Sequence, residues 1–409
     1  MKKCTTWSKG IVFKRLVLAA GIICVLAAKL PAQDTVELLT RMKAMEERIK
    51  TLEAEVQTLK GQQPPAAPTP SVEQAPGPAA SYGGAAPAAA KVFNPDISVI
   101  GDFLGAAGNG ANRPTPALEM HESEIGLQAV IDPYARADVF LSFGEQGVGL
   151  EEGYLTFTSL PGALQLRVGK MRAAFGRVNT LHNHVLPWTD RPLVTQNLVA
   201  GEEGISDAGL SLSRILPAPK NIFLEGTAQI FRGDTEGLFR ATRRSDVSTV
   251  GHLRAYRDIS ESTNLDLGVS YARGHSPDTD GSNQLYGLDA TLRWKPLRRA
   301  IYRSFIARSE FIWGRTQAVL LAKPFGYYVS GDYQLGRRWF VGARFDRSER
   351  LTNAQLQDTG GSAVLTYWPS EFSQIRGQLR RTRYGENLTA NELLFQFQFS
   401  MGAHGAHPF

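Results

Sequence analysis

Residues 391–400 read NELLFQFQFS, a stretch in which every second position is apolar: Leu393, Phe395, Phe397 and Phe399. Successive side chains of a β-strand point to opposite faces, so this stretch predicts a strand with one apolar and one polar face. A tilted strand of about ten residues crosses the apolar part of a bilayer. The same alternation recurs from residue 93 onward, for example at 265–271, 286–294 and 339–346. The region therefore reads as all-β, with strands of membrane-crossing length.

Sixteen such segments follow one another, with expected starts near residues 96, 122, 134, 150, 163, 205, 221, 248, 263, 284, 302, 324, 338, 359, 372 and 391. Short connections such as 160–162 and 336–337 alternate with long ones such as 172–204. A soluble β-sandwich also alternates, but short turns at one end and long loops at the other are typical of transmembrane barrels, which close without a free edge. We therefore predict a sixteen-stranded antiparallel transmembrane β-barrel over residues 93–409, with both of its ends in the periplasm.

Residues 1–32 begin with a basic stretch, continue with an apolar run at 16–28, and end on the small residue Ala32. This order predicts a secretory signal peptide. A membrane anchor, which needs about 20 apolar residues, and a lipoprotein site at Cys24 are the alternatives. Cys4 and Cys24 are the only cysteines of the chain, so removal of the signal leaves no thiol, disulfide or cysteine metal site.

The charge of the mature chain differs from that of the whole sequence. The sequence has 45 basic and 39 acidic residues, and six of the basic ones lie in residues 1–32, which leaves 39 of each sign. The basic isoelectric point thus stems mostly from the signal. It gives no reason to expect a nucleic-acid partner.

Residues 33–61 carry a heptad repeat that predicts a short α-helical coiled coil. Its core positions are Leu38, Met42, Met45, Ile49, Leu52, Val56 and Leu59. Opposite charges five residues apart, such as Arg41 and Glu46, fit parallel helices. A single amphipathic helix lying on the barrel is the alternative. Residues 62–92 are rich in proline and alanine and read as an extended linker.

With signal, coiled coil, linker and barrel together, the chain resembles the porin superfamily that includes phosphate-selective porins. Two stretches, 93–98 (FNPDIS) and 175–193 (FGRVN through HNH to DRPL), resemble outer-membrane proteins labelled zinc-regulated, TonB-dependent receptors. The chain departs from true receptors of that kind, which have a plug and about 22 strands. The porin resemblance implies a channel, a trimer, a third outer loop folded into the barrel, and a terminal Phe409 read by the outer-membrane assembly machinery.

Residues 172–204 would be that third outer loop, and their length exceeds what a simple connection needs. Functionally, they could form a pore constriction; alternatively, the loop packs on the rim with its charges solvated or paired. The charged candidates are Arg172, Arg177, His182, His184, Asp190, Arg191, Glu202 and Glu203.

His182 and His184 share a face in an extended segment and could bind zinc through their imidazole nitrogens. Asp190 or Glu202 could complete the ligand set. The alternative is a pair of ordinary loop histidines that form hydrogen bonds. His404 and His407 are weaker candidates, and no other cofactor is expected.

The alternation places many charges on the lumen side: Arg136, Arg167, Arg254, Arg293, Arg308, Arg344, Arg376, Arg380, Asp138, Asp266, Asp289, Glu310, Asp332 and Asp346. Residues 93–240 have a net charge of −6 and residues 241–409 one of +7, so a transverse field across the pore is expected. The alternative is that these groups pair along the wall. Leu288 and Val341 should face lipid, and Thr291 the lumen.

These observations predict a bacterial outer-membrane channel for passive diffusion of small hydrophilic solutes. The alternatives are a metal-linked (zinc) uptake channel and a structural tether to the periplasm or cell wall through the coiled coil. No nucleophile elbow, phosphate loop or zinc-protease helix occurs, so no enzyme activity is expected. The expected partners are outer-membrane lipids, the assembly machinery and two further copies in a homotrimer.

Overall fold

The computed structural model describes residues 95–110, 116–145, 147–316 and 323–402, together with five helical positions: Lys43, Glu47, Arg48, Lys50 and Thr51. The predicted signal, coiled-coil core, linker, His404, His407 and Phe409 lie outside the described residues. No helix of the described part is long and apolar enough to cross a membrane. The strands belong to the second of two units, Gly83–Phe409.

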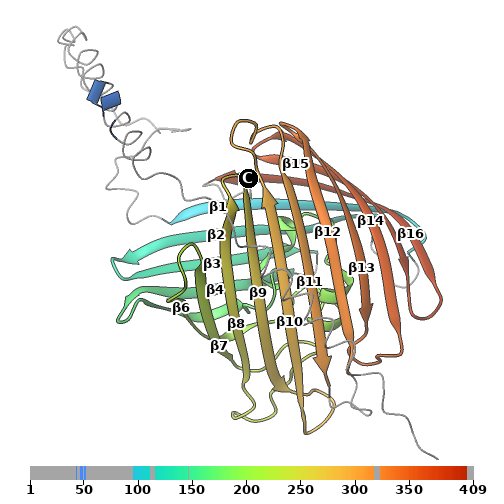
Figure 1. Cartoon of the computed structure of the whole chain (residues 1–409). Coiled ribbons are helices and arrows are strands. Elements are labelled where there is room, and N and C mark those ends of the chain that lie inside the picture. The colour runs from blue at the N-terminus through green and yellow to red at the C-terminus, as the bar shows by residue number, and fades with distance from the viewer. Residues whose placement is uncertain are drawn as a thin grey trace, which may run out of the picture. The chain divides into compact units, whose positions relative to one another are not determined.

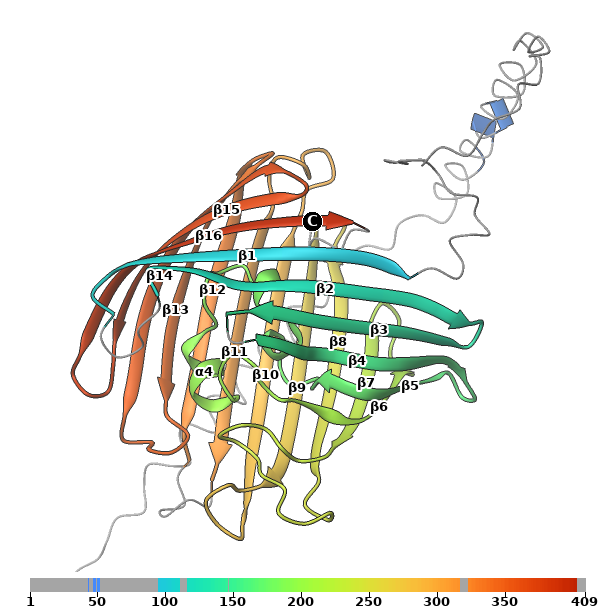
Figure 2. The same ribbon diagram turned by 180° about the vertical axis from the view of Figure 1, so that it is seen from behind.

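The alternating segments form sixteen strands that close into an antiparallel barrel (Figures 1 and 2). The strands are β1 (Asp96–Gly108), β2 (Leu118–Asp132), β3 (Ala135–Gly144), β4 (Gly147–Leu160), β5 (Leu164–Arg172), β6 (Ser206–Leu216), β7 (Phe223–Phe231), β8 (Ser248–Ser260), β9 (Thr263–His275), β10 (Ser282–Trp294), β11 (Phe305–Arg315), β12 (Phe325–Gly336), β13 (Trp339–Glu349), β14 (Gln357–Ser370), β15 (Ser373–Arg383) and β16 (Thr389–Gly402). Each strand pairs with its neighbours in sequence, and β16 pairs with β1. The predicted sixteen-stranded closed barrel is confirmed.

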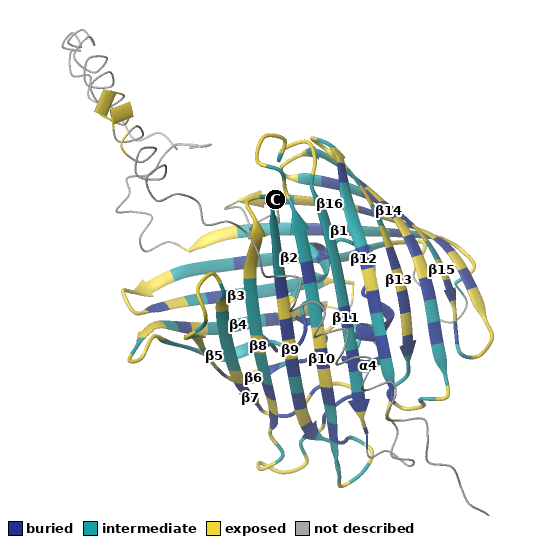
Figure 3. Ribbon diagram, in the orientation of Figure 1, coloured by how far each residue is buried: buried dark blue, intermediate teal, exposed yellow. Residues whose placement is uncertain are grey.

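The two faces of the wall differ as the alternation predicts. Leu288 and Val341 are each 40% exposed, whereas Thr291 faces inward and is 4% exposed. Figure 3 shows buried and exposed positions alternating along the long strands. Exposed apolar side chains line the outside of most strands: Leu210, Leu253, Val269, Leu288, Val329, Val341, Leu365, Leu379 and Leu393. Such an outer face suits contact with lipid.

Aromatic side chains gather on the outer face near strand ends. Trp339 stacks on Tyr367 with ring centroids 4.4 Å apart. Phe311, Trp313 and Phe325 form a second stack. Trp339 and Tyr367 lie where an interfacial aromatic girdle would be, and the second stack runs from the strand end toward the middle of the wall.

The seam between β1 and β16 closes the barrel on both faces. On the inner face, Gln396 donates a hydrogen bond to Asp102 at 2.8 Å. On the outer face, the ring of Phe399 lies across Gly101, where a Cβ atom would come within 2.3 Å of the ring. Only glycine leaves room for the ring at this point.

Two β-bulges interrupt the alternation in neighbouring parts of the wall. In β2 the pairing with β1 skips His121, and in β4 the pairing with β3 skips Glu151. A bulge adds one residue to a strand and re-aims its side chains. As a result Glu151 and Glu152, although adjacent in sequence, both reach groups inside the barrel.

Candidate functional site inside the barrel

The long connection between β5 and β6 folds into the barrel. It contains two 3₁₀ turns, η1 (Val178–Thr180) and η2 (Asn183–Val185), and the short helix α4 (Leu193–Leu198). The helix contacts β11, β12, β13 and β14, and Figure 2 shows it within the ring of strands. We call residues 172–204 the inner loop. It packs against the inner face of the wall and does not lie on the rim.

The FGRVN stretch anchors the start of the inner loop. Gly176 donates its backbone N–H to the Ser270 hydroxyl at 2.9 Å. The backbone N–H groups of Arg177 and Val178 donate to one oxygen of Glu310 at 2.5 and 2.7 Å. Gly176 has a φ of +60°, and a Cβ there would lie 3.1 Å from Glu310. The turn therefore needs glycine, and the expected lumen charge Glu310 accepts hydrogen bonds from the loop backbone.

Asn179 ties the two ends of the inner loop together. Its amide donates to the carbonyls of Ala173 at 2.9 Å and Ile205 at 3.1 Å, and its carbonyl oxygen accepts the Ile205 N–H at 2.8 Å. Ala173 also donates its N–H to the Ile205 carbonyl at 2.8 Å, which extends the β5–β6 pairing. The loop thus leaves and re-enters the wall at one point.

An apolar core lies between the inner loop and the wall. The loop contributes Ala173, Phe175, Val178, Leu186, Trp188, Val194, Leu198 and Val199, and the wall contributes Phe231, Val250, Ala272, Leu285, Ile312, Tyr328 and Val364. The wall residues occupy inward positions that alternation alone assigns to polar groups. Runs such as 311–313 (FIW) and 363–365 (AVL), apolar at successive positions, are the sequence signal for this core. Burial of this apolar surface favours the folded-in loop.

Asp190 joins the inner loop to the basic part of the wall. Its carboxylate accepts hydrogen bonds from Arg344 at 2.9 Å and from Arg380 at 2.7 Å. Arg344 also lies 4.8 Å above the Trp188 ring, and Arg376 donates to the Trp188 carbonyl at 3.1 Å. Although burial alone would raise it, the two guanidinium groups lower the pKa of Asp190 to about 2. The carboxylate is therefore charged and paired at neutral pH.

The two histidines join the inner loop to the acidic part of the wall. Nδ1 of His182 lies 2.5 Å from Glu124, and its Nε2 lies 2.9 Å from Glu152. Nδ1 of His184 lies 3.2 Å from Glu122. Although burial alone would lower it, hydrogen bonds to the glutamates raise the pKa of His182 to about 11. His182 and His184 come together, with ring centroids 5.6 Å apart.

The residues expected to complete a zinc site with the histidines lie elsewhere. Asp190 is bound by the arginines, and Glu202 lies 3.7 Å from His121. The structure instead brings Glu122, Glu124 and Glu151 to the histidine pair. The sequence could not single these out, because β2 and β4 meet the loop only in the folded barrel.

The other charged residues of the inner loop bind within it or beside it. Arg172 donates to the Glu203 carbonyl at 2.7 Å and lies 3.3 Å from Glu151. Arg191 donates to Asn183 and to the Val178 carbonyl, so it shapes the turn that carries the histidines. These contacts hold the loop in one conformation.

Many expected lumen charges pair along the wall. The pairs are Arg136 with Asp138, Arg254 and Arg293 with Asp266, Arg308 with Asp332, and Arg344 with Asp346. Arg167 lies over the Tyr154 ring, and Asp289 lies 3.8 Å from His252. These charged groups therefore pair along the wall, which is the alternative to a free transverse field across the pore.

Charge asymmetry remains where the inner loop meets the wall. The acidic group lies on β2 and β4 and the basic group on β13 and β15, with β14, β16, β1 and β3 completing that part of the ring. The loop presents histidines to the acidic strands and Asp190 to the basic ones. The two charge groups of the wall thus hold the loop across the lumen.

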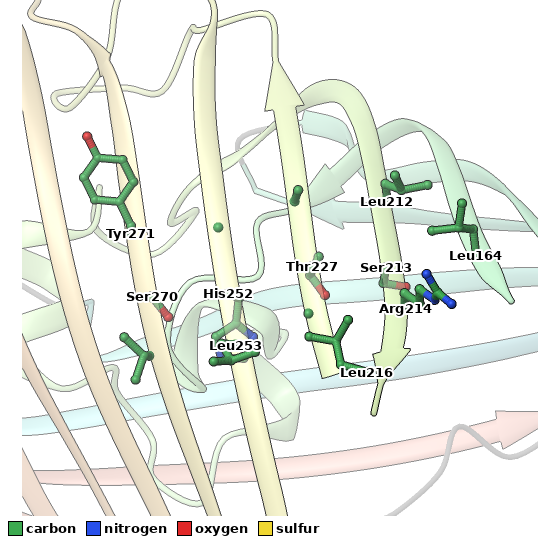
Figure 4. Close-up of a pocket in the computed structure, with 14 residues that line it drawn as sticks. Leu164, Leu212, Ser213, Arg214, Leu216, Thr227, His252, Leu253, Ser270 and Tyr271 are labelled. Carbon is green, nitrogen blue, oxygen red and sulfur yellow. The ribbon is translucent and has the colours of Figure 1, made fainter. Parts of the chain in front are cut away.

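A hollow of about 510 Å³ lies along β5–β9. Its lining includes the small residues Gly226, Ala228 and Gly251 as well as Leu212 and Leu253, and the two leucines are labelled in Figure 4. Both leucines belong to the exposed outer face. The hollow is therefore separate from the inner loop.

No family model matches the chain. An uncharacterized protein of Aquifex aeolicus (strain VF5) is 30% identical to it, over 79% of this chain and 81% of that protein. The chain belongs to the family of this Aquifex protein.

Solved structures show the porin fold. An anion-selective porin from Comamonas acidovorans matches with a TM-score of 0.55 at 11% identity, over 75% of this chain and 99% of that one. OprB of Pseudomonas putida matches with a TM-score of 0.54 at 10% identity, over 76% and 95%. The outer-membrane channel DcaP of Acinetobacter baumannii matches with a TM-score of 0.51 at 10% identity, over 75% and 96%. The resemblance to TonB-dependent receptors is not supported, because the barrel of this chain closes with sixteen strands and the structures that it matches include a porin and an outer-membrane channel.

Proposed function

We propose that the protein is an outer-membrane channel through which small hydrophilic solutes diffuse passively, and that the inner loop sets the width of the passage. The inner loop carries this proposal. A segment of this length bound across the lumen by ion pairs at two sides leaves less room for solute than an open barrel. The apolar outer face and the porin fold support a location in the outer membrane.

Liposome swelling tests whether the barrel conducts solute. The purified full-length protein is reconstituted, and swelling is followed in neutral sugars of increasing size. We expect fast swelling with the smallest sugars and a sharp decline with size. Liposomes that swell no faster than protein-free ones would reject the channel.

The absence of catalysis is part of the proposal. Many of the charged side chains described inside the barrel contact the inner loop or pair along the wall. The tether alternative rests on the coiled coil, which lies outside the described residues.

A trimer is also proposed. The Vibrio cholerae protein OmpT, which shares this fold at a TM-score of 0.51 and 8% identity, has a trimer form. The hollow between β5 and β9 offers small side chains on the outer face, where a second wall could approach closely.

A further inference from the structure

Six ionisable side chains meet where the inner loop touches β2 and β4. His182 and His184 come from the loop, and four glutamates come from the wall: Glu122, Glu124, Glu151 and Glu152. Between 3% and 13% of each of these six side chains is exposed. We call these six residues the His–Glu cluster.

The cluster carries more negative charge than its surroundings neutralise. One guanidinium, that of Arg172, lies 3.3 Å from Glu151 among the described contacts of the four carboxylates. Buried carboxylates need a cation close by. A divalent cation bound between the carboxylates and the two imidazoles would supply such a charge.

The donor atoms lie close enough together to hold one metal ion. Ligands about 2.0–2.1 Å from a tetrahedral zinc ion lie about 3.4 Å from one another. The Glu124 oxygen lies 2.5 Å from Nδ1 of His182 and 3.7 Å from Nδ1 of His184, and the donor atoms of these three residues all lie within 4.8 Å of one another. A carboxylate oxygen of Glu151 lies 3.0 Å from Nδ1 of His182, in reach as a fourth ligand.

Glu152 orients the imidazole ring of His182 from the side opposite the other donor atoms. Nε2 of His182 lies 2.9 Å from Glu152, while its Nδ1 faces the other donors. The second oxygen of Glu152 accepts the backbone N–H of Arg172 at 2.7 Å. Histidine ligands of metals usually donate their other ring N–H to a carboxylate in this way. The bulge in β4 makes it possible, because it points Glu151 and Glu152 at the same imidazole.

We propose that Glu124, His182 and His184, with Glu151 as fourth ligand, bind one divalent transition-metal ion of the zinc class that fastens the inner loop to the wall. Two imidazoles with carboxylates favour zinc over calcium or magnesium, which prefer oxygen ligands alone. This site does not depend on the channel function, because binding can be measured without transport.

The test uses full-length protein purified without a histidine tag, stripped of metal, and titrated with Zn²⁺ and with Co²⁺. We expect one zinc ion per chain and, with cobalt, the visible absorption bands of a four-coordinate ion with nitrogen ligands. Magnesium and calcium should not compete. If the wild-type protein binds no zinc, or gives only the spectrum of six-coordinate aqueous cobalt, the proposal is wrong, whatever the variants do.

Variants locate the ion. His182→Gln with His184→Gln should abolish binding, whereas the matched control His404→Gln with His407→Gln should retain it. If the His182→Gln, His184→Gln variant still binds zinc and the His404→Gln, His407→Gln variant does not, the ion belongs to the chain end and the proposal is wrong. Glu152→Gln keeps all four ligands, so it should weaken zinc binding about 10- to 100-fold without changing the stoichiometry. Unchanged affinity in Glu152→Gln would contradict the orienting role of Glu152.

Discussion

Asp190 of the inner loop is bound by arginines from two strands of the wall. Arg344 on β13 and Arg380 on β15 both donate to its carboxylate, and Gln378 on β15 donates to it as well. Arg344 is almost fully buried, so loss of its partner leaves a charge away from water. Breaking a buried ion pair from one side typically costs about 3–5 kcal/mol.

We therefore expect Asp190→Asn to loosen the inner loop. Limited proteolysis in detergent should cut the variant within residues 172–204, where the wild type resists. Asp246→Asn is the matched control, because Asp246 binds within its own exposed turn through Thr242 and Arg243. Equal resistance of Asp190→Asn and wild type would show that Asp190 does not hold the loop.

The Asp190 carboxylate should also make the stability of the folded-in loop depend on pH. The guanidinium groups of Arg344 and Arg380 outweigh its burial and hold the folded-state pKa of Asp190 near 2, below the ordinary value of 3.8. A group with a lowered pKa stabilises the folded state above its ordinary pKa, and this contribution is lost as pH falls through the folded-state value. The other charges near Asp190, Asp346 and Glu392, are themselves paired with these arginines.

The acid response can be followed through Trp188, which is 1% exposed and packs on Arg344. Its fluorescence, taken as the difference between wild type and Trp188→Phe, should shift to the red between about pH 4 and pH 2 and stay constant from pH 5 to 7. A red shift centred above pH 5 would exclude Asp190 as its cause.

At the scale of the strands, alternation predicted the architecture because each face of the wall meets one environment. Two of the expected starts fall too late where a bulge breaks the period. Strands β2 and β4 were expected near 122 and 150, directly after or beside the bulge residues His121 and Glu151, yet they begin at Leu118 and Gly147. The extra residue reverses which face the preceding side chains point to. The outer ends of these strands therefore do not continue the alternation of apolar and polar residues that follows the bulge.

The partners of the inner loop could not be predicted from the sequence. Its length and charges marked it as a candidate, but Asp190 and Arg344 are 154 positions apart. Which strands the loop reaches depends on the ring order of the closed barrel. The inward apolar residues, such as Ile312 and Val364, were likewise missed, because a lumen was expected to be polar throughout.

The facing of the strands can be tested directly. Leu288 is on the outer face of β10. Leu288→Arg should reduce the free energy of unfolding by about 2–4 kcal/mol if the residue lies near the bilayer midplane. Leu288→Met, measured in parallel by denaturant titration in lipid, should change it by less than about 1.5 kcal/mol. Similar stability of the two variants would place Leu288 away from lipid.

At the scale of the whole molecule, assembly remains a prediction. Porin resemblance favours three chains, and a coiled coil tethered to trimeric barrels would form readily, since tethering raises the effective concentration to about millimolar. Mass measurement in mild detergent should give three chains per particle. Ile49→Asp with Leu52→Asp should leave that mass unchanged if the walls supply the main contact, whereas a stable wild-type monomer or dimer would refute the trimer.

We propose that the closed wall encloses a passage and that the inner loop narrows this passage. The inner loop can be removed without breaking the pairing of β5 with β6. Ala173 and Ile205 are already hydrogen-bonded across the β5–β6 ladder, so an Asn-Gly turn can replace residues 174–204. Shortening residues 277–280 between β9 and β10 is the matched control, because this loop follows an odd-numbered strand at the same end of the barrel.

Single-channel recording in planar bilayers compares these proteins most directly. We expect wild type to give discrete ohmic steps, the loop replacement to give steps several-fold larger, and the shortened 277–280 loop to match wild type. Equal step sizes for wild type and the loop replacement, or no steps from either, would contradict the account.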